Sequence, residues 1–302
     1  MKSLRLDISI IIITRNRTQL LAKCLFPLLE QIQNREHIEV LIVDNNSSDN
    51  TIDFLMDFTN KNPQFHYFIE NQVGASFARN KGIAIAKGSW LSFLDDDGIP
   101  DADFIEKLVF TIENYDFDGF GGMWYPYAEK KVPSWIPIEV TTMRLLSKEI
   151  SKIPYGETVA AGICAFKKDI VLKAGCFSTE VGPRDGKMGY NEEVFLQHKI
   201  WQLGGIIGFN PEWSMRHYVS DTKFSLIWNL KRYYLKGRDS NAYLERLTIS
   251  EKIILAFRVV LVPPYQLILN MPKMLFNKNY LWQNLILDSF KYSFRIFGRI
   301  TN

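Results

Sequence analysis

The sequence predicts an α/β fold in which a mostly parallel, Rossmann-like central sheet is flanked by helices and followed by a helical C-terminal region. The first 100 residues alternate apolar runs with helix-like segments, and the runs are apolar on both faces, as buried parallel strands are. Past residue 222 the chain becomes basic and aromatic. We therefore expect one domain over residues 1–222 and a separate helical region over 223–302.

Strands and helices are predicted to alternate in the first part of the chain. The expected strands are Ile8–Ile13, Val40–Val43, Phe65–Ile69 and Trp90–Leu94, and the expected helices are Leu20–Gln33, Asn50–Asn60 and Ala75–Ala86. In such sheets, ligands bind at the carboxyl ends of the parallel strands. The polar residues that follow these strands are therefore the candidate binding residues.

The next part of the chain is less regular. A helix to Asn114, a strand over Gly119–Tyr125, an apolar run over Thr158–Phe166 and a helix over Lys168–Ala174 are predicted. Residues 126–155 are rich in Pro, Trp and Lys and lack clear periodicity. This segment is either a mobile loop over a substrate site or a surface insertion.

Cysteine usage and the N-terminus bear on the compartment. Cys24, Cys164 and Cys176 show no paired or CxxC spacing, so neither a disulfide framework nor a zinc site is indicated. The apolar run at residues 8–13 is too short for a secretion signal and is typical of a strand. A reducing, cytoplasmic setting is expected.

The C-terminal region differs from the rest of the chain in charge. Residues 223–302 hold 13 lysines and arginines against 4 acids, a local charge of +9, and leave −6 on the other residues. Its apolar runs, Ile253–Leu261 and Tyr265–Met271, are interrupted by Arg258 and by Pro263-Pro264, so neither is expected to span a membrane. We expect contact with the inner face of a cell membrane, or packing on the first domain or a second subunit. Nucleic acid is disfavoured because no recognised binding module accompanies the charge.

Three consecutive carboxylates, Asp95, Asp96 and Asp97, stand where the fourth strand ends. Unpaired buried carboxylates are costly, but clustered ones bind a divalent cation well. Neither GxGxxG nor GxxxxGK[ST] occurs in the chain, which argues against a nicotinamide dehydrogenase and a P-loop enzyme. A nucleotide bound here must be held by side chains and by Mg²⁺ or Mn²⁺. Asp44, at the end of the second strand, is a further candidate ligand-binding residue, whereas residues 47–49 suit a helix cap.

A second acidic group, Glu192 and Glu193, opens a predicted helix. Acids in a first helical turn complement the helix dipole, but two adjacent carboxylates also repel, which suits a general base. His217 stands alone in the sequence and is either a structural residue or a metal ligand.

Four motifs in order over about 90 residues resemble the nucleotide-binding half of the family 2 glycosyltransferases, which have the GT-A fold. They are Ile10–Arg15, Val43–Thr51, Gly74–Gly82 and Phe93–Pro100. The resemblance implies that Thr14, Asp44 and Arg79 surround the base and ribose of a nucleotide-sugar, usually a UDP-sugar. Arg15, which ends the first motif, is counted with these nucleotide-binding residues.

The same resemblance implies roles for the acids. Asp95 and Asp97 form the DxD pair, with Asp97 the direct metal ligand and Asp96 lining the sugar. Gly98 stands where relatives often have a fourth acid, which leaves the metal register open by one residue. Glu193 is the implied base and Glu192 its acceptor-binding neighbour. His217 is implied to approach the metal or the diphosphate, and Arg232 or Arg238 the diphosphate.

The expected function is inverting, metal-dependent transfer of a sugar from a nucleoside diphosphate donor to an acceptor hydroxyl. A glycan or lipid-linked glycan acceptor, in polysaccharide or glycolipid synthesis, fits the basic tail, and a homo-oligomer is left open. Two alternatives are a sugar-nucleotide pyrophosphorylase, whose glycine-rich loop with a lysine is missing here, and a non-catalytic nucleotide-sugar-binding protein.

Overall fold

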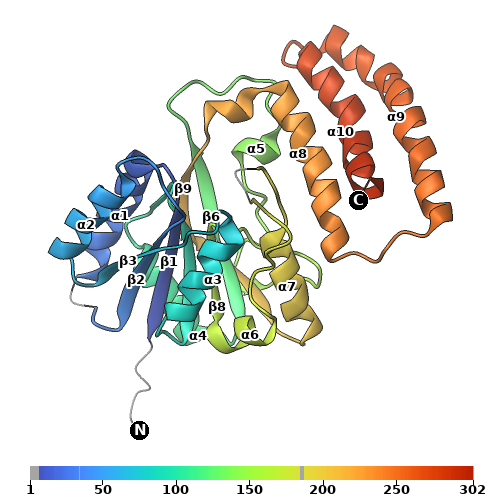
Figure 1. Ribbon diagram of the computed structural model, residues 1–302. Helices are drawn as coiled ribbons and strands as arrows, with labels where there is room; N and C mark the ends of the chain where they lie inside the picture. The colour runs from blue at the N-terminus through green and yellow to red at the C-terminus, as the bar shows by residue number, and fades with distance from the viewer. Residues whose placement is uncertain (1–6, 34, 184–186, 302) are drawn as a thin grey trace. The chain divides into compact units, whose positions relative to one another are not determined.

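The computed structural model describes residues 7–33, 35–183 and 187–301 (Figure 1). Its strands are β1 Ile8–Thr14, β2 Ile38–Asp44, β3 Phe65–Ile69, β4 Trp90–Asp95, β5 Gly98–Pro100, β6 Gly119–Tyr127, β7 Ser151–Lys152, β8 Ile163–Lys167 and β9 Ile207–Tyr218. Its α-helices are α1 Thr18–Ile32, α2 Thr51–Lys61, α3 Ala75–Ile85, α4 Phe104–Asn114, α5 Ile138–Thr141, α6 Lys168–Lys173, α7 Glu192–Gln202, α8 Leu226–Asp239, α9 Ile249–Phe276 and α10 Trp282–Ile300. The strands and helices predicted for the first 100 residues are confirmed to within a few residues.

The strands form one mixed sheet in the order β3-β2-β1-β4-β8-β6-β9-β5, with β7 paired to β9. β3, β2, β1 and β4 are parallel, as predicted. The pairs β4–β8, β6–β8, β5–β9 and β7–β9 are antiparallel. The register sets Ile13 opposite Asp95 and Thr14 opposite Asp44, so the polar residues at the carboxyl ends of three neighbouring strands share one edge.

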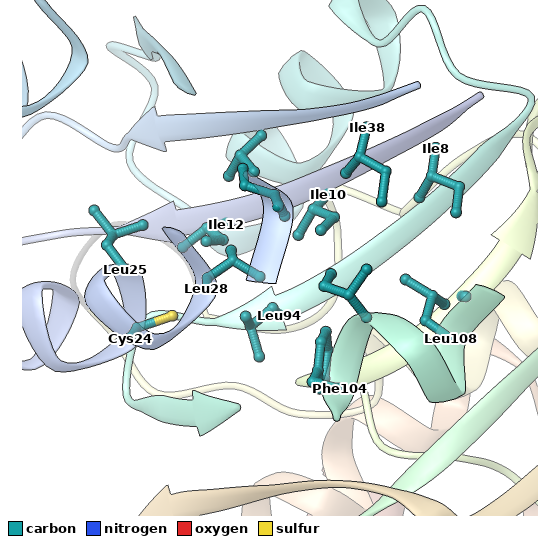
Figure 2. Packing of buried hydrophobic residues seen from close by; sticks show 14 of the residues in the cluster. Ile8, Ile10, Ile12, Cys24, Leu25, Leu28, Ile38, Leu94, Phe104 and Leu108 are labelled. Atoms are coloured by element: carbon teal, nitrogen blue, oxygen red, sulfur yellow. The ribbon is translucent and has the colours of Figure 1, made fainter. Parts of the chain in front are cut away.

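Each face of the parallel strands has its own hydrophobic core, because side chains alternate between the faces of a strand. Ile8, Ile10 and Ile12 of β1 pack with residues of α1 and α4, among them Leu28 and Phe104 (Figure 2). Ile11 of the same strand belongs to the opposite core, which includes residues of α3, α6 and α7. Covering both faces with helices is what allows the strands to be apolar throughout.

The chain divides into two compact units. The first comprises the described residues up to Tyr125, residues 143–187 and Glu192–Tyr218, and it contains the sheet. The second comprises Pro126–Thr142, Met188–Asn191 and the chain from Val219. The boundary predicted after residue 222 falls close to the start of the last of these segments. The assignment of domain roles to these parts stays a prediction.

The second unit is helical. Its helices α8 and α9 both pack against α10 (Figure 1). Residues 126–142 contribute a small core of their own, in which Trp135, Ile136 and Val140 are buried and contact residues near the start of α8. The first half of the segment that had no clear periodicity therefore contains a short helix, α5, packed inside this unit.

One expectation for the C-terminal region is wrong. The two apolar runs are not separate pieces, because α9 continues through Pro263 and Pro264 as a single helix of 28 residues. Proline removes a backbone donor and strains a helix, but the segment on each side is long, and Pro263 is buried. By length and composition, α9 could cross a membrane, with a mean hydropathy of 1.7 over its most apolar 18 residues.

Candidate active site

The candidate site lies at the carboxyl edge of β1, β2 and β4 in the first unit. Thr14 ends β1, Asp44 ends β2 and Asp95 ends β4, so three predicted site residues lie on adjacent strands. Asp96 and Asp97 follow before β5 begins at Gly98. The parallel sheet thus brings together acids that are about 50 residues apart in the sequence.

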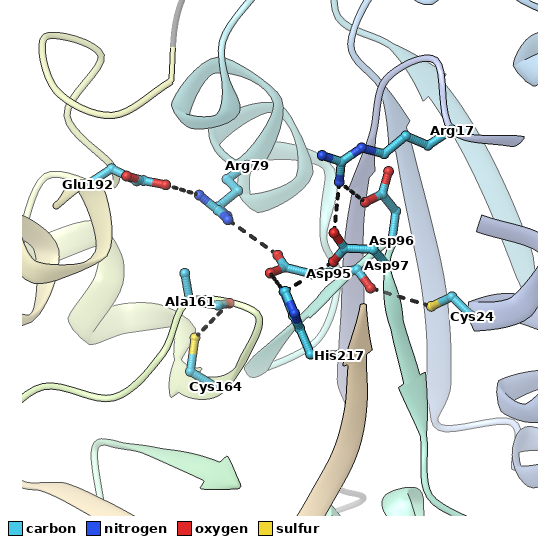
Figure 3. Close-up of polar contacts among 10 residues, drawn as sticks. All are labelled: Arg17, Cys24, Arg79, Asp95, Asp96, Asp97, Ala161, Cys164, Glu192 and His217. Atoms are coloured by element: carbon cyan, nitrogen blue, oxygen red, sulfur yellow. Dashed lines mark hydrogen bonds and ion pairs between the residues drawn. The ribbon is translucent and has the colours of Figure 1, made fainter. Parts of the chain in front are cut away.

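Asp96 is held by two neighbours. Thr14 Oγ1 donates to its Oδ2 at 2.7 Å. Arg17 Nη1 donates to its Oδ1 at 3.0 Å (Figure 3). Burial raises the pKa of Asp96 to about 7, against the attraction of Arg17 and with further help from the charges of Asp97 and Asp95. Three neighbouring carboxylates repel one another when all are ionised, and a divalent cation bound between them would reduce this repulsion.

Arg17 also reaches the second of these acids, with Nη1 3.1 Å from Asp97 Oδ2. The carboxylates raise the pKa of this guanidinium, Asp96 most of all, although burial opposes the effect. Arg17 was not among the predicted site residues, and the predicted Arg15 is exposed. The signal in the sequence was Asn16, a residue that tolerates left-handed backbone and has φ +53° here, which turns the chain between the two arginines.

Asp95, Asp97 and His217 form a candidate metal centre. One ligand atom from each lies within 4.8 Å of the other two. His217 Nε2 is 3.3 Å from Asp97 Oδ1 and 3.8 Å from Asp95 Oδ2. Two carboxylates and an imidazole suit Mn²⁺ well, since it accepts both oxygen and nitrogen ligands. The donor set therefore fits a divalent cation, and this also supports Asp95 and Asp97 as the DxD pair.

Backbone pairing sets the register of this centre. β5 and β9 pair so that His217 lies opposite Gly98, and Tyr218 N donates to Asp97 O at 2.9 Å. A Cβ at residue 98 would lie 2.5 Å from the sulfur of Met215, so a larger residue there would require the Met215 side chain to move. At Gly162 the close neighbour is an acid of the cluster, because a Cβ there would lie 2.1 Å from Asp95 Oδ2. Gly162 therefore leaves space that the Asp95 carboxylate occupies.

Arg79 connects the two acidic groups. Its Nη1 donates to Glu192 Oε1 at 2.9 Å, and its Nη2 lies 3.5 Å from Asp95 Oδ1 (Figure 3). Arg79 and Glu192 are both buried, and the guanidinium also lies over the ring of Phe177. Burial opposes the charge on Arg79, but Glu192 and Asp95 together raise its pKa. Glu192 is thus committed to an ion pair, whereas Glu193 is the next residue of the same first helical turn.

Asp44 offers an acceptor to a ligand. Its Oδ2 accepts from Ser47 N at 3.0 Å, but its Oδ1 is buried without a hydrogen-bond partner among the described residues. A buried acceptor without a partner is costly unless a ligand donates to it. Ser47 lies in the turn before α2, where Asp49 accepts from Thr51 N at 3.0 Å across a two-residue turn. The role of Asp44 in binding a ligand stays a prediction, and the N-cap of α2 is Asn50 rather than one of residues 47–49.

The two arginines expected near the diphosphate lie in the second unit. Arg232 is buried and donates to Glu139 O at 3.3 Å, and Arg238 Nε donates to Asp239 Oδ1 at 2.6 Å. Their approach to a diphosphate stays a prediction. The three cysteines are free, and burial raises the pKa of each thiol, which makes them poor nucleophiles.

Comparison with known proteins identifies the class to which this fold and site belong. Residues 9–173 match the family described as glycosyl transferase family 2, more than half of the chain. The chain belongs to this family and has the GT-A fold.

Individual relatives agree with the family. Glycosyltransferase AglE of Haloferax volcanii is 35% identical over 172 residues, 56% of this chain and 55% of the relative. The glucosyl-dolichyl phosphate glucuronosyltransferase of the same organism is 24% identical over 240 residues, 72% and 75% of the two chains. Glycosyltransferase GlyG of Streptococcus pneumoniae is 33% identical over 125 residues, 40% of each. The chain spans about half the length of the curated relatives AglE and GlyG.

Solved structures share the fold at low identity. Mannosyltransferase PcManGT from Pyrobaculum calidifontis, in complex with GDP-Man and Mn²⁺, has a TM-score of 0.65 and 16% identity, covering 97% of this chain and 86% of that one. S. aureus TarS 1-349 in complex with UDP has a TM-score of 0.57 and 16% identity, covering 98% and 90%. These likenesses support the GT-A architecture.

Proposed function

We propose that the protein transfers a sugar from a nucleoside diphosphate sugar, of which a UDP-sugar is the first to test, to an acceptor hydroxyl with inversion at the anomeric carbon. The observation that carries the proposal is the Asp95, Asp97 and His217 cluster at the strand ends of a family 2 chain. Two similar structures support a nucleotide donor, since one holds GDP-Man with Mn²⁺ and the other UDP. Family membership disfavours the pyrophosphorylase alternative.

In this proposal the residues of the strand ends bind the donor. Asp97, Asp95 and His217 would hold Mn²⁺ or Mg²⁺, which when bound stabilises the negative charge of a diphosphate leaving group. Asp44 would accept from the base through its buried Oδ1, and Thr14 would keep Asp96 oriented beside the donor. Arg79 holds Glu192 and approaches Asp95, so it acts here as a link between the acids.

Glu193 would take the proton of the acceptor hydroxyl. Glu192 is paired with Arg79 at 2.9 Å and buried, so its carboxylate is already used. Glu193 follows it in the first turn of α7, where the helix dipole favours a carboxylate. The division of the acidic pair into one positioning residue and one base is part of the proposal.

The acceptor and the location complete the proposal. Two relatives bear names that refer to dolichyl phosphate glycans, one from Haloferax volcanii and one from Methanococcus voltae. A lipid-linked or growing glycan acceptor, on the cytoplasmic side of a membrane that contacts residues 223–302, fits these names and the basic tail.

Assay of a panel of nucleotide-sugars with Mn²⁺, Mg²⁺ and EDTA tests the reaction. We expect release of nucleoside diphosphate that requires the metal, and Asp97→Ala to lower it about 10³-fold, since the cation contributes several kcal/mol. The matched control is Asp116→Ala, because that carboxylate is 98% exposed in a weak surface pair. No turnover with any donor, together with metal-dependent donor binding, would leave a non-catalytic binding protein; equal rates for both variants would remove the metal role.

A further inference from the structure

The outward face of α9 is an exposed apolar surface in the second unit. Phe257, Val260, Leu261, Ile268, Leu275 and Phe276 are each at least 63% exposed. At 28 residues and about 1.5 Å per residue, the helix is about 42 Å long. An apolar surface of this length is well beyond the isolated exposed side chains of ordinary soluble proteins.

The opposite side of α9 is packed and carries polar residues. Lys252, Gln266 and Asn270 fall on this side at helical spacing, and Asn270 is buried. Asn270 accepts from Lys273 Nζ at 2.7 Å, so this side satisfies its own polar groups. Because α9 packs against α10, only its other side is left for an external partner (Figure 1).

The charge of the region indicates which partner. Residues 223–302 carry +9, and Arg258 and Lys278 are exposed on α9 and just beyond its end. An apolar face bordered by lysine and arginine matches the interface of a bilayer that contains anionic lipid. A second copy of this chain would instead bring two regions of +9 together, which is unfavourable.

The neighbouring helix decides between lying in the membrane and crossing it. α10 lies against α9 and carries Asp288, Lys291 and Arg295. If α9 crossed the bilayer as packed, it would draw these charges and Asn270 toward the hydrocarbon, which is costly. Lying in the interface, α9 buries its apolar face and leaves α10 on the aqueous side.

We propose that α9 lies in the plane of an anionic bilayer, with its outward face at the boundary between headgroups and acyl chains. This inference rests on the membrane contact proposed for residues 223–302. It is independent of the transfer reaction.

Flotation of the full chain with vesicles tests it. We expect binding to phosphatidylcholine vesicles that contain phosphatidylglycerol, and about tenfold weaker binding for Leu261→Glu and for Ile268→Glu, since each replaces an apolar side chain that would leave water with a carboxylate that anionic lipid repels. The matched control is Ile227→Glu on α8, which alters a side chain that is 78% exposed in the same unit and should bind as the unchanged chain does. Equal binding by all variants overturns the proposal.

The charge contribution has its own variant. Arg258→Gln should weaken binding about fivefold on vesicles with phosphatidylglycerol and leave binding to pure phosphatidylcholine unchanged, because only anionic lipid attracts the guanidinium. The same weakening on both lipids would contradict the electrostatic part.

Depth and oligomeric state separate the remaining outcomes. In a Cys176→Ser background, a polarity-sensitive dye on Leu261→Cys should be quenched by nitroxides near the headgroups and little by those at the bilayer centre. Strong quenching at the centre would show a crossing helix, and a dimer whose α9 face no longer binds vesicles would show a second copy as the partner. Either outcome overturns the proposal.

Donor turnover measured without vesicles should be equal in the unchanged chain and Leu261→Glu, so loss of membrane binding and loss of the reaction are distinguished.

Discussion

The two units of this chain depart differently from the usual arrangement of apolar side chains inside and charged side chains outside. The first buries charge: Asp96, Arg79 and Glu192 are all at most 6% exposed. The second exposes apolar surface, up to 87% at Phe276. The buried charges are offset by ion pairs within the chain, Arg79 with Glu192 and Arg17 with Asp96, whereas exposed apolar side chains in water gain no such compensation. A cation and a donor would complete the first, and a lipid surface the second.

The acidic pair gives the largest expected effects. Glu193→Gln should lower the rate of transfer about 10²- to 10⁴-fold, since it removes the proposed base, and should lower the unfolding temperature less than the same change at the buried Glu192. Glu192→Gln should instead lower the free energy of unfolding by about 3–5 kcal/mol, because the neutral amide removes the negative charge 2.9 Å from the buried Arg79 and leaves Asp95, at 3.5 Å, to compensate it. Kinetics and thermal unfolding of both variants measure this. Glu149→Gln, at an exposed position, is the control.

A reversal of this pattern would reassign the pair. If Glu192→Gln lost activity while remaining fully stable, Glu192 would be the base and the ion pair with Arg79 would be unimportant for folding.

The second prediction concerns Arg17, whose guanidinium contacts two of the three aspartates. Arg17→Met should lower the free energy of unfolding in EDTA by about 1–2 kcal/mol, because Asp96 and Asp97 lose a donor at 3.0 and 3.1 Å that is itself half exposed. It should also increase the rise in unfolding temperature caused by Mn²⁺, since no guanidinium then competes for the carboxylates. Thermal unfolding with EDTA and with Mn²⁺ gives both values.

Arg15→Met serves as the matched control, because Arg15 is exposed two residues earlier. An unchanged response to Mn²⁺ in Arg17→Met would mean that Arg17 and the metal do not share the acids.

The smallest expected effect is in the second unit. Ile268→Gln on the outward face of α9 should change the free energy of unfolding in water by no more than about 0.5 kcal/mol, because this side chain is 71% exposed. By contrast Leu285→Ala on α10 should cost about 2–5 kcal/mol, since Leu285 is buried. Chemical denaturation compares them. A large loss from Ile268→Gln would show that the outward face is covered within the protein.

Much of the first unit could be predicted because its signals are local. The strands are short apolar runs bounded by turns, and Thr14, Asp44 and Asp95 stand where those runs stop, so the parallel sheet brings them to one edge. His217 is a harder case. Its place beside Asp97 depends on the antiparallel pairing of β9 with β5, which no local pattern encodes.

The contacts that were missed depend on backbone conformation and tertiary packing, which residue type and position in the sequence do not specify. Arg17 and Arg15 are the same residue type two positions apart, with Asn16 in the left-handed region between them, and Arg17 is the one that contacts Asp96 and Asp97. The partnership of Arg79 with Glu192 joins residues 113 apart through a buried ion pair. In α9 the error was to treat two prolines as a break, although tertiary packing can retain a helix through them.

The glycine at residue 162 suggests one way in which a related chain could lose its metal site without losing an acid. A chain with alanine at this position would retain every acid of the DxD region and its net charge, yet the new methyl group would occupy the place of the Asp95 carboxylate, 2.1 Å from Oδ2. A sequence search for the DxD aspartates would still count that chain as a metal-binding glycosyltransferase. A methyl group just before β8 would therefore displace a candidate metal ligand without changing any residue of the DxD motif.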